Sequence, residues 1–335
     1  MSPLIDVHCH VTPKSFPACP DISVSNRWPC MQCFDKDKAK IFMGDSHFRD
    51  LDDRSWNAAR RVEDMGRDGV SLQVLSAMPE LLSYWMPSNK GQIICDHSNA
   101  FLADMVARDR KHFRGFGLVP LQDPESAAKG LSDIINKFGL SGVEVGSNVN
   151  GRMLGDSFFN PFWEAAEDLE LAVFVHALHP VAVKSINATP IFTNMVGFPV
   201  DVAMAVSSLI ISGTLERYPR LKIGFSHGGG GLGSMLGRLD KWWEISDGYG
   251  GSCFKKPSEQ AKGLFLDSNV YDPIYLGHLE NIVSPGHIFA GSDYPYSLMQ
   301  ESLSDYIGSA KFNASSLMDV RYKAAEAFLG EIIYS

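Results

Sequence analysis

The stretch LIDVHCHVTP, residues 4–13, combines the apolar, β-branched composition of a buried strand with two histidines. Successive side chains of a strand point to opposite faces, so His8 and His10 share one face and Cys9 takes the other. Pro13 cannot continue a strand ladder and ends the strand. Two imidazoles placed this way at a strand end can hold one metal ion. Two histidines that are merely hydrogen-bonded are the alternative until further ligands are identified.

The composition is that of a globular protein with a large core. The chain has 335 residues, 45% hydrophobic and 21% charged, enough for one large barrel or two ordinary domains. Its net charge of −9 disfavours nucleic acid and anionic membranes as partners. No apolar run approaches the roughly 20 residues that span a bilayer, and no signal peptide precedes His8. We therefore expect a cytoplasmic protein that acts on a small molecule.

The cysteine content also leads us to expect a cytoplasmic protein. Six cysteines are sparse and irregularly spaced, which is typical of free thiols in a reducing cytoplasm. Cys30 and Cys33 have CxxC spacing, but no second CxxC or HxH nearby completes a zinc cage. We interpret the pair as two incidental loop thiols, with a structural zinc or redox role as the alternative.

Short apolar runs alternate with helical patterns along the chain, as in a barrel of parallel strands. An open doubly wound sheet is the alternative, but no Gly-rich dinucleotide fingerprint follows the first strand. We predict a single domain, residues 1–335, folded as a distorted (β/α)8 TIM barrel. The predicted strands are 4–9, 70–76, 114–120, 141–146, 171–176, 221–226, 263–268 and 287–291, and the predicted helices are 56–68, 88–110, 124–138, 158–169, 200–217, 229–246, 272–283 and 315–330.

Two connections are longer than the usual few residues. Residues 11–55, inserted after the first strand, and residues 177–199 show little periodicity. Both follow strands, so in a barrel both lie at the C-terminal face, where catalytic sites are found. We expect residues 11–55 to form a lid or small subdomain and both segments to influence substrate choice.

Polar residues at the ends of the predicted strands supply a candidate metal site. His8 and His10 end the first strand, His176 ends the fifth, and Asp293 follows the eighth. Three imidazoles and a carboxylate suit Zn²⁺ or a similar divalent ion and leave a position for water or substrate. A lone His176 or His227 is more often a core or loop residue, but these ligands in this order favour one metal site.

His227 ends the sixth predicted strand and precedes the glycines 228–231. Glycines let the backbone turn tightly and approach a ligand without a Cβ clash. Because the pKa of histidine lies near neutrality, we expect His227 to act as a general acid or base above the metal. Asp293 is the second catalytic candidate, as a proton acceptor that also touches the metal.

This pattern resembles the amidohydrolase superfamily, with HxH on the first strand, histidines on the fifth and sixth, and an aspartate on the eighth. More narrowly it resembles the branch of α-amino-β-carboxymuconate-ε-semialdehyde decarboxylase, with the γ-resorcylate and 5-carboxyvanillate decarboxylases. The resemblance covers nearly the whole chain. It includes FRDLDDRSWNAARRVEDMGRDGVSLQVLSAMPELLSYW (48–85), FGLVPLQDPESA (116–127), SHGGGGLGSMLGRLD (226–240) and AGSDYPY (290–296).

The resemblance assigns roles to residues. One divalent metal, usually zinc with manganese as the alternative, would be held by His8, His10, His176 and Asp293, and His227 would be the acid/base histidine. Arg49 would bind a substrate carboxylate, with a loop salt bridge as the alternative. Arg238 would bind a second carboxylate across a homodimer interface, with a surface cation as the alternative. Arg238 follows His227 by eleven residues, about 16 Å of helix, too far for its own metal centre.

The activity that the resemblance implies is non-oxidative decarboxylation of an unsaturated or aromatic carboxylic acid, in the catabolism of aromatic compounds. Phe48, Trp85 and Tyr294 could pack on such a planar acid, although each is by default a core residue. A metal-dependent hydrolase or hydratase uses the same ligands and is the main alternative. A non-catalytic binding protein on the same barrel would be expected to lack some of these residues.

The sequence departs from the branch after the fifth strand. The decarboxylase that names the branch reads His-Pro-Trp-Asp there, whereas this chain reads His-Ala-Leu-His-Pro from His176 to Pro180. That loop shapes the substrate pocket, so the substrate itself stays open. We interpret Glu144 as a buried carboxylate near the metal, and His179 as a loop residue or an additional pocket group.

Overall fold

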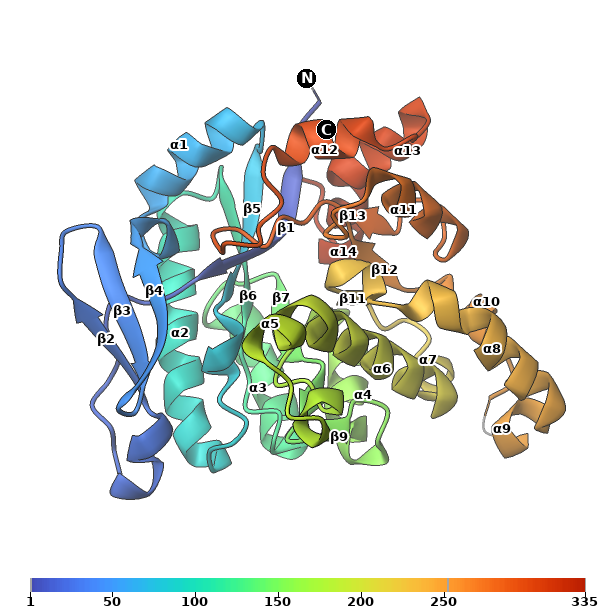
Figure 1. The fold of residues 1–335 in the computed structure, drawn as a ribbon, viewed down its shortest axis with the longest axis horizontal. Coiled ribbons are helices and arrows are strands. Elements are labelled where there is room, and N and C mark those ends of the chain that lie inside the picture. Colours follow the sequence, from blue (N-terminus) through green and yellow to red (C-terminus); the bar gives the residue numbers. More distant parts are fainter. Residues whose placement is uncertain (1, 252, 335) are drawn as a thin grey trace.

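The computed structural model describes residues 2–251 and 253–334. Eight parallel strands form a nearly closed barrel surrounded by helices, which confirms the predicted (β/α)8 architecture (Figure 1). The strands follow one another around the sheet in chain order: β1 (Ile5–Val11), β5 (Leu72–Ala77), β6 (Phe113–Gly117), β7 (Gly142–Gly146), β10 (Ala172–His176), β11 (Ile223–Phe225), β12 (Phe265–Asp267) and β13 (Ile288–Phe289). All eight predicted strands are present.

The barrel closes between its first and last strands. The Val7 amide of β1 donates to the Ala290 carbonyl just after β13, at 2.8 Å. The His10 amide donates to the Tyr294 carbonyl at 2.7 Å. Every residue of β1 is buried, as expected for a strand that neighbours cover on both faces.

A cluster of aromatic rings fills one end of the barrel. Phe116, Phe174, Phe265 and Phe289 come from four strands and form one hydrophobic cluster with Phe328 of α14 (Ala324–Leu329). The Phe328 ring lies 5.1 Å from the rings of Phe265 and Phe289. Apolar packing therefore occupies the end of the barrel that α14 covers, and polar groups gather at the ends of the strands.

Helices follow the strands as predicted. Asn57 caps α1 by accepting from the amides of Ala59 and Arg60, and Gly69 ends α1 in the left-handed region. The longer helices are α1 (Ala58–Asp68), α2 (Ser88–Arg108), α3 (Pro124–Asn136), α4 (Asn160–Asp168), α6 (Phe198–Ile211), α8 (Leu232–Ile245), α11 (Pro273–His278) and α12 (Leu303–Ser309); the shorter ones are α5 (Pro190–Phe192), α7 (Thr214–Arg217), α9 (Asp247–Gly251), α10 (Pro257–Ala261) and α13 (Ala314–Met318).

The helix predicted over 200–217 has different bounds. Helical structure begins at Pro190 with α5, continues through a π-helical turn, η6 (Thr193–Gly197), into α6, and breaks at Gly213 before α7. The segment Pro190–Ile211 is long and apolar enough to cross a membrane by composition. However, α6 buries seven of its side chains, as a core helix does.

Residues 11–55 contain a small antiparallel sheet beside the barrel (Figure 1). Its strands are β2 (Pro29–Cys33), β3 (Lys38–Met43) and β4 (Ser46–Asp52), and a 3-10 turn, η1 (Ile22–Arg27), precedes them. The sequence analysis found little periodicity here, although Ala39, Ile41 and Met43 alternate as the buried face of β3. The role of this segment as a lid stays a prediction.

The CxxC pair lies within strand β2. Residues three apart in a strand are about 10 Å apart and point to opposite faces. A disulfide needs Cα atoms within about 7 Å, so Cys30 and Cys33 cannot join each other in this conformation. All six cysteines are free, and Cys19, Cys30 and Cys33 are the exposed ones.

We predict that iodoacetamide labels three thiols of the native protein rapidly, because Cys9, Cys95 and Cys253 are buried. Intact-protein mass spectrometry would count the labels before and after unfolding. The Cys30→Ser/Cys33→Ser double variant should lose two rapid labels and fold normally. Persistent labelling of only one thiol in the wild-type protein would contradict the assignment.

Candidate metal centre and its cavity

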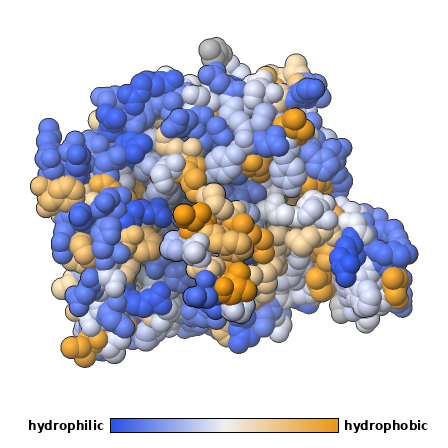
Figure 2. All heavy atoms as spheres, in the orientation of Figure 1, coloured by the Kyte–Doolittle hydropathy of each residue, from blue (hydrophilic) through white to orange (hydrophobic). Residues whose placement is uncertain are grey.

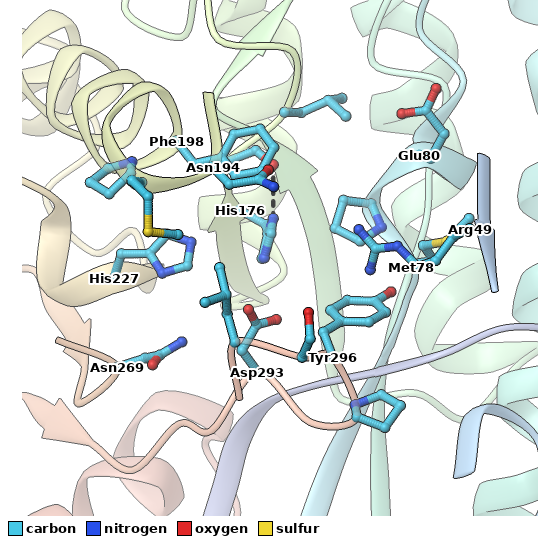
Figure 3. Close-up of a pocket in the computed structure, with 18 of the residues that line it drawn as sticks. Arg49, Met78, Glu80, His176, Asn194, Phe198, His227, Asn269, Asp293 and Tyr296 are labelled. Atoms are coloured by element: carbon cyan, nitrogen blue, oxygen red, sulfur yellow. Dashed lines mark hydrogen bonds between the residues drawn. The ribbon is translucent and has the colours of Figure 1, made fainter. Parts of the chain in front are cut away.

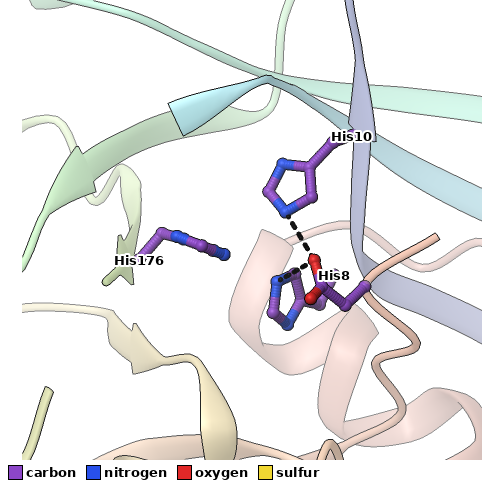
Figure 4. A group of neighbouring side chains, drawn as sticks. His8, His10 and His176 are labelled. Atoms are coloured by element: carbon purple, nitrogen blue, oxygen red, sulfur yellow. Dashed lines mark ion pairs between the residues drawn. The ribbon is translucent and has the colours of Figure 1, made fainter. Parts of the chain in front are cut away.

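Three histidines and an aspartate meet where the barrel strands end (Figure 4). β1 supplies His8 and His10, β10 ends in His176, and Asp293 follows β13. One potential ligand atom from each lies within 4.8 Å of all the others, and all four side chains are buried. The structure thus brings together the four predicted ligands from two strands and from the segment that follows a third.

Hydrogen bonds at the far ring nitrogens orient the three imidazoles. His8 Nδ1 bonds Asp267 Oδ2 at 2.6 Å, His10 Nδ1 bonds the Ala77 carbonyl at 3.1 Å, and His176 Nδ1 bonds the Ala177 carbonyl at 2.8 Å. A proton on each Nδ1 leaves the lone pair on Nε2 facing the common point.

The atoms that face this point lack hydrogen-bond partners among the described residues. They are Nε2 of His8, His10 and His176 and Oδ1 of Asp293. Asp293 Oδ1 lies 3.1 Å from His10 Nε2 and 3.4 Å from His8 Nε2, close but without hydrogen-bond geometry. Buried polar atoms are rarely left unpaired. Three nitrogens and one carboxylate oxygen fit a divalent cation such as Zn²⁺ or Mn²⁺.

The protonation states of two ligands suit a cation. Burial, with the neighbouring His10 and His8, holds the pKa of His176 well below its usual value. Burial alone would raise the pKa of Asp293, but the imidazoles of His10 and His8 hold it well below its usual range. His8 differs, because Asp267 and Asp293 outweigh the effect of burial and raise its pKa to about 10. A bound cation would therefore displace a proton from His8.

The sequence analysis missed Asp267 at the end of β12. Besides bonding His8, this buried carboxylate accepts from the Gly228 amide at 2.7 Å. It therefore links a metal-ligand strand to the turn that carries His227. Its position at the end of the predicted strand 263–268 was the signal that could have identified it.

His227 lies beside the ligands on the turn after β11. Its ring centroid is 5.5 Å from that of His8 and 5.6 Å from that of His176, and its buried Nε2 atom has no hydrogen-bond partner in the part of the chain that the structure describes. Burial, with nearby His8, lowers its pKa. The turn needs Gly230, whose φ is +63° and whose added Cβ would clash with the Pro199 carbonyl.

The metal centre lies in the wall of a cavity of about 940 Å³ (Figure 3). His176, His227 and Asp293 line it, and so does Arg49 of β4. This volume is near the upper end of the range for small-molecule sites. The inserted sheet thus contributes to the same cavity as the barrel.

Arg49 presents an unpaired cation to this cavity. Its guanidinium lies 4.0 Å from the centroid of the Tyr296 ring, and Tyr296 stacks on His10 at 5.1 Å. No carboxylate of the described residues lies within ion-pair distance of Arg49, so its hydrogen-bond donors are available to an anion. Phe48 also lines the cavity and is 40% exposed.

The other aromatic candidates are placed differently. Trp85 does not line this cavity but stacks on His179, which does. Tyr294 is buried and donates to Asp64 at 2.8 Å. Tyr296, two residues further along, lines the cavity instead. Sequence reasoning missed it because the turn after β13 determines which tyrosine faces inward.

Two further candidates lie at different distances from the centre. Arg238 is exposed on α8 and does not line the cavity of its own chain. Glu144 is fully buried on β7, with Oε1 3.8 Å from His10 Nδ1. Glu144 thus lies behind a ligand, as expected for a carboxylate near the metal.

Comparison with known proteins agrees with this geometry. The family model described as amidohydrolase matches residues 5–331. The chain belongs to the amidohydrolase family. A relative of this chain, the 2-amino-3-carboxymuconate-6-semialdehyde decarboxylase of Dictyostelium discoideum, is 30% identical over 317 residues, covering 92% of this chain and 88% of the relative.

Solved structures of other proteins share the fold of this chain. The 5-carboxyvanillate decarboxylase of Sphingomonas paucimobilis has a TM-score of 0.82 at 23% identity, covering 98% of this chain and 99% of that one. The dihydroxybenzoic acid decarboxylase of Polaromonas sp. JS666, solved with manganese and 2-nitroresorcinol, has a TM-score of 0.76 at 20% identity, covering 98% and 97%.

We predict that His10→Ala and Asp293→Asn each abolish retention of a stoichiometric divalent metal by this protein, because each removes a donor atom from the four-ligand cluster. Asp267→Asn should weaken metal affinity by about 10–100-fold, since Asp267 orients the ligand His8 and is not itself one of the four ligands. Chelation, reloading and elemental mass spectrometry would measure this. His278→Ala, an exposed histidine, is the control. Full retention by His10→Ala would contradict the site.

Proposed function

We propose that this protein is a metal-dependent, non-oxidative decarboxylase of an unsaturated or aromatic carboxylic acid. The observation that carries the proposal is a four-ligand centre in the wall of a cavity that Arg49, a cation with no ion pair among the described residues, also lines. The named relatives and structural neighbours, which are decarboxylases, support it. A role in the cytoplasmic catabolism of aromatic compounds is part of the proposal.

We infer that His8, His10, His176 and Asp293 hold one divalent metal. Zn²⁺ is our first choice from the donor set, and Mn²⁺ is the alternative, because manganese is bound in a structural neighbour. When bound, such an ion polarises an oxygen of the substrate and neutralises charge that develops during the reaction.

Arg49 and the aromatic groups beside it orient the acid. A guanidinium binds a carboxylate through two parallel hydrogen bonds and fixes its plane. Phe48 and Tyr296 also line the cavity, with their rings 5.6 and 4.0 Å from the guanidinium, so a planar acid held by Arg49 would lie beside aromatic side chains. The carboxylate is thereby held with its scissile bond aligned to the π-system.

His227 supplies the proton. As CO₂ leaves, the bonding electron pair stays on the substrate carbon, which takes a proton from Nε2 of His227. The lowered pKa makes the protonated imidazole a stronger acid, so this transfer is favoured once His227 has taken up a proton from substrate or solvent. The carboxylate of Asp293 is the second acceptor for a proton during turnover.

We further propose a homodimer in which Arg238 reaches the neighbouring cavity. α8 extends from the barrel and forms a separate lobe in the surface view (Figures 1 and 2). Arg238, Trp242 and Ile245 recur at helical spacing on α8, and the last two are 60% and 63% exposed. An exposed apolar stripe of this kind favours an interface.

A complementary apolar surface lies at the cavity mouth. Figure 2 shows apolar side chains over α5 and the start of α6. Ile191 and Met195 there are 76% and 50% exposed, and Met195 also lines the cavity. A second copy that covered this surface would lie next to the metal centre.

We predict that the metal-loaded protein releases CO₂ from at least one member of a panel of hydroxylated aromatic and unsaturated carboxylic acids. Mass spectrometry of the products would detect the loss. His227→Ala should lower the rate by at least about 100-fold, because it removes the proton donor. Products that have gained water would instead assign the protein to the hydrolase or hydratase class with the same ligands.

The dimer proposal predicts complementation between two inactive variants. Asp293→Asn lacks a metal ligand but keeps Arg238, whereas Arg238→Ala keeps its metal site. Mixed dimers restore one complete site, so mixing should recover about a quarter of the wild-type activity. Each variant alone is the control. No recovery, with mixed dimers shown by native mass spectrometry, would place the function of Arg238 within its own chain.

A further inference from the structure

Four side chains from four segments form a compact cluster at the rim of the cavity. Arg27 comes from η1 of the inserted segment, Glu80 from the 3-10 turn η3 (Pro79–Leu82) after β5, Trp85 from the connection to α2, and His179 from the loop after β10. Glu80 and His179 line the cavity, whereas Arg27 and Trp85 lie behind them. The reaction proposed above uses none of the four.

In this cluster Arg27, Trp85 and His179 are stacked, and the carboxylate of Glu80 bonds His179. The Arg27 guanidinium lies 4.0 Å from the Trp85 ring, and the Trp85 and His179 rings are 4.7 Å apart with an interplanar angle of 16°. Glu80 Oε2 bonds His179 Nε2 at 2.8 Å, and Glu80 Oε1 lies 3.8 Å from Arg27. The ring of His179 is therefore held on its face and at one nitrogen.

The backbone of His179 adopts a left-handed conformation. Its φ angle is +45°, and residues other than glycine adopt this conformation at a cost of order 1–3 kcal/mol. The Trp85 stack and the Glu80 hydrogen bond offset that cost. Such strained residues cluster at ligand-binding sites.

Glu80 retains hydrogen-bonding capacity that the protein does not use. Its side chain is 9% exposed and faces the cavity, and among the described residues its only hydrogen bond comes from His179. An ionised carboxylate can accept about four hydrogen bonds. The unsatisfied part of this acceptor is therefore open to a ligand in the cavity.

The cavity wall thus carries a guanidinium, from Arg49, and at another place a carboxylate, from Glu80. In Figure 3, Glu80 lies at the upper right and Asp293 near the lower centre, and Arg49 lies at the right, at a height between them. A planar acid held by Arg49 would direct its far end toward Glu80. A hydroxyl or amino group there could donate to Glu80, whereas a second carboxylate would be repelled.

We propose that Glu80 and His179 form a specificity site for a hydrogen-bond donor carried by the substrate at the end remote from the leaving carboxylate. The proposal deepens the function proposed above and rests on it. The preferred acids would carry a hydroxyl or amino group at that end, and acids with a second carboxylate there would be excluded. Trp85 is then a positioning residue that acts through His179.

Three unreactive probes test this site. In 2-nitrophenol, 4-nitrobenzene-1,3-diol and 3-hydroxy-4-nitrobenzoic acid, a nitro group takes the place of the leaving carboxylate. The probes differ only at the position para to it, which bears hydrogen, hydroxyl and carboxylate respectively. Isothermal titration calorimetry with the metal-loaded protein would give the three affinities. Because the probes do not react, this result is independent of whether CO₂ is released from any acid.

We expect the wild-type protein to bind the diol at least about tenfold more tightly than 2-nitrophenol, as one hydrogen bond to a charged group allows, and to bind the benzoic acid more weakly than either. Glu80→Gln should reduce the advantage of the diol to less than about threefold and improve binding of the benzoic acid. Comparing variant with wild type cancels the intrinsic differences among the probes.

Two further variants provide a second test of the site and a matched control. His179→Phe preserves the stack but removes the ring nitrogens, and it should also reduce the advantage of the diol. Glu164→Gln makes the same chemical change as Glu80→Gln at an exposed site on α4 and should change nothing. Binding of 2-nitrophenol, unchanged in every variant, shows that the cavity is intact.

Trp85 is tested by its rescue. Trp85→Ala should lower the preference for the diol, and Trp85→Phe, which retains a ring to stack on His179, should restore it. An equal advantage of the diol in Glu80→Gln and wild type would overturn the proposal. Failure of all three probes to bind the metal-loaded wild-type protein would overturn it as well.

Discussion

Strand β1 is hydrogen-bonded on both sides, to β5 and to the segment that follows β13, and this double pairing fixes the direction of His8 and His10. Both histidines point inward because residues two apart in a strand share a face. The same pairing brings the end of β13 beside β1, so Asp293 lies next to both imidazoles. The metal centre is thus a direct consequence of how the barrel closes.

The sequence predicted the features that repeat or that lie at strand ends. The eight apolar runs and the four ligands could be identified because parallel strands bring their ends to one face. Contacts between distant segments could not be identified in this way. The stack of Trp85 on His179 joins residues 94 positions apart and depends on the shapes of two loops. Tyr296 likewise faces the cavity only because the turn after β13 directs it there.

The candidate metal ligands are easier to recognise in the sequence than the groups that orient them. The histidines that face the metal centre stand out in the sequence, since few other patterns place three of them at strand ends. Asp267 is one carboxylate among 39 acidic residues; its place at the end of a predicted strand was the one sequence signal, and its bonds to His8 and Gly228 show its role. Loss of either hydrogen bond would be costly because Asp267 is buried, so no water could replace the lost partner.

The inserted sheet has a separate consequence. Arg49 comes from β4, outside the barrel, whereas every candidate metal ligand comes from the barrel strands or the turns that follow them. The candidate metal ligands and Arg49, which the proposed function uses to bind the acid, therefore come from different parts of the chain. Sequence change can accumulate in the inserted segment while the reactive centre stays constant. The cavity wall can therefore change at Arg49, on the inserted sheet, without any change in the strands that carry the candidate metal ligands.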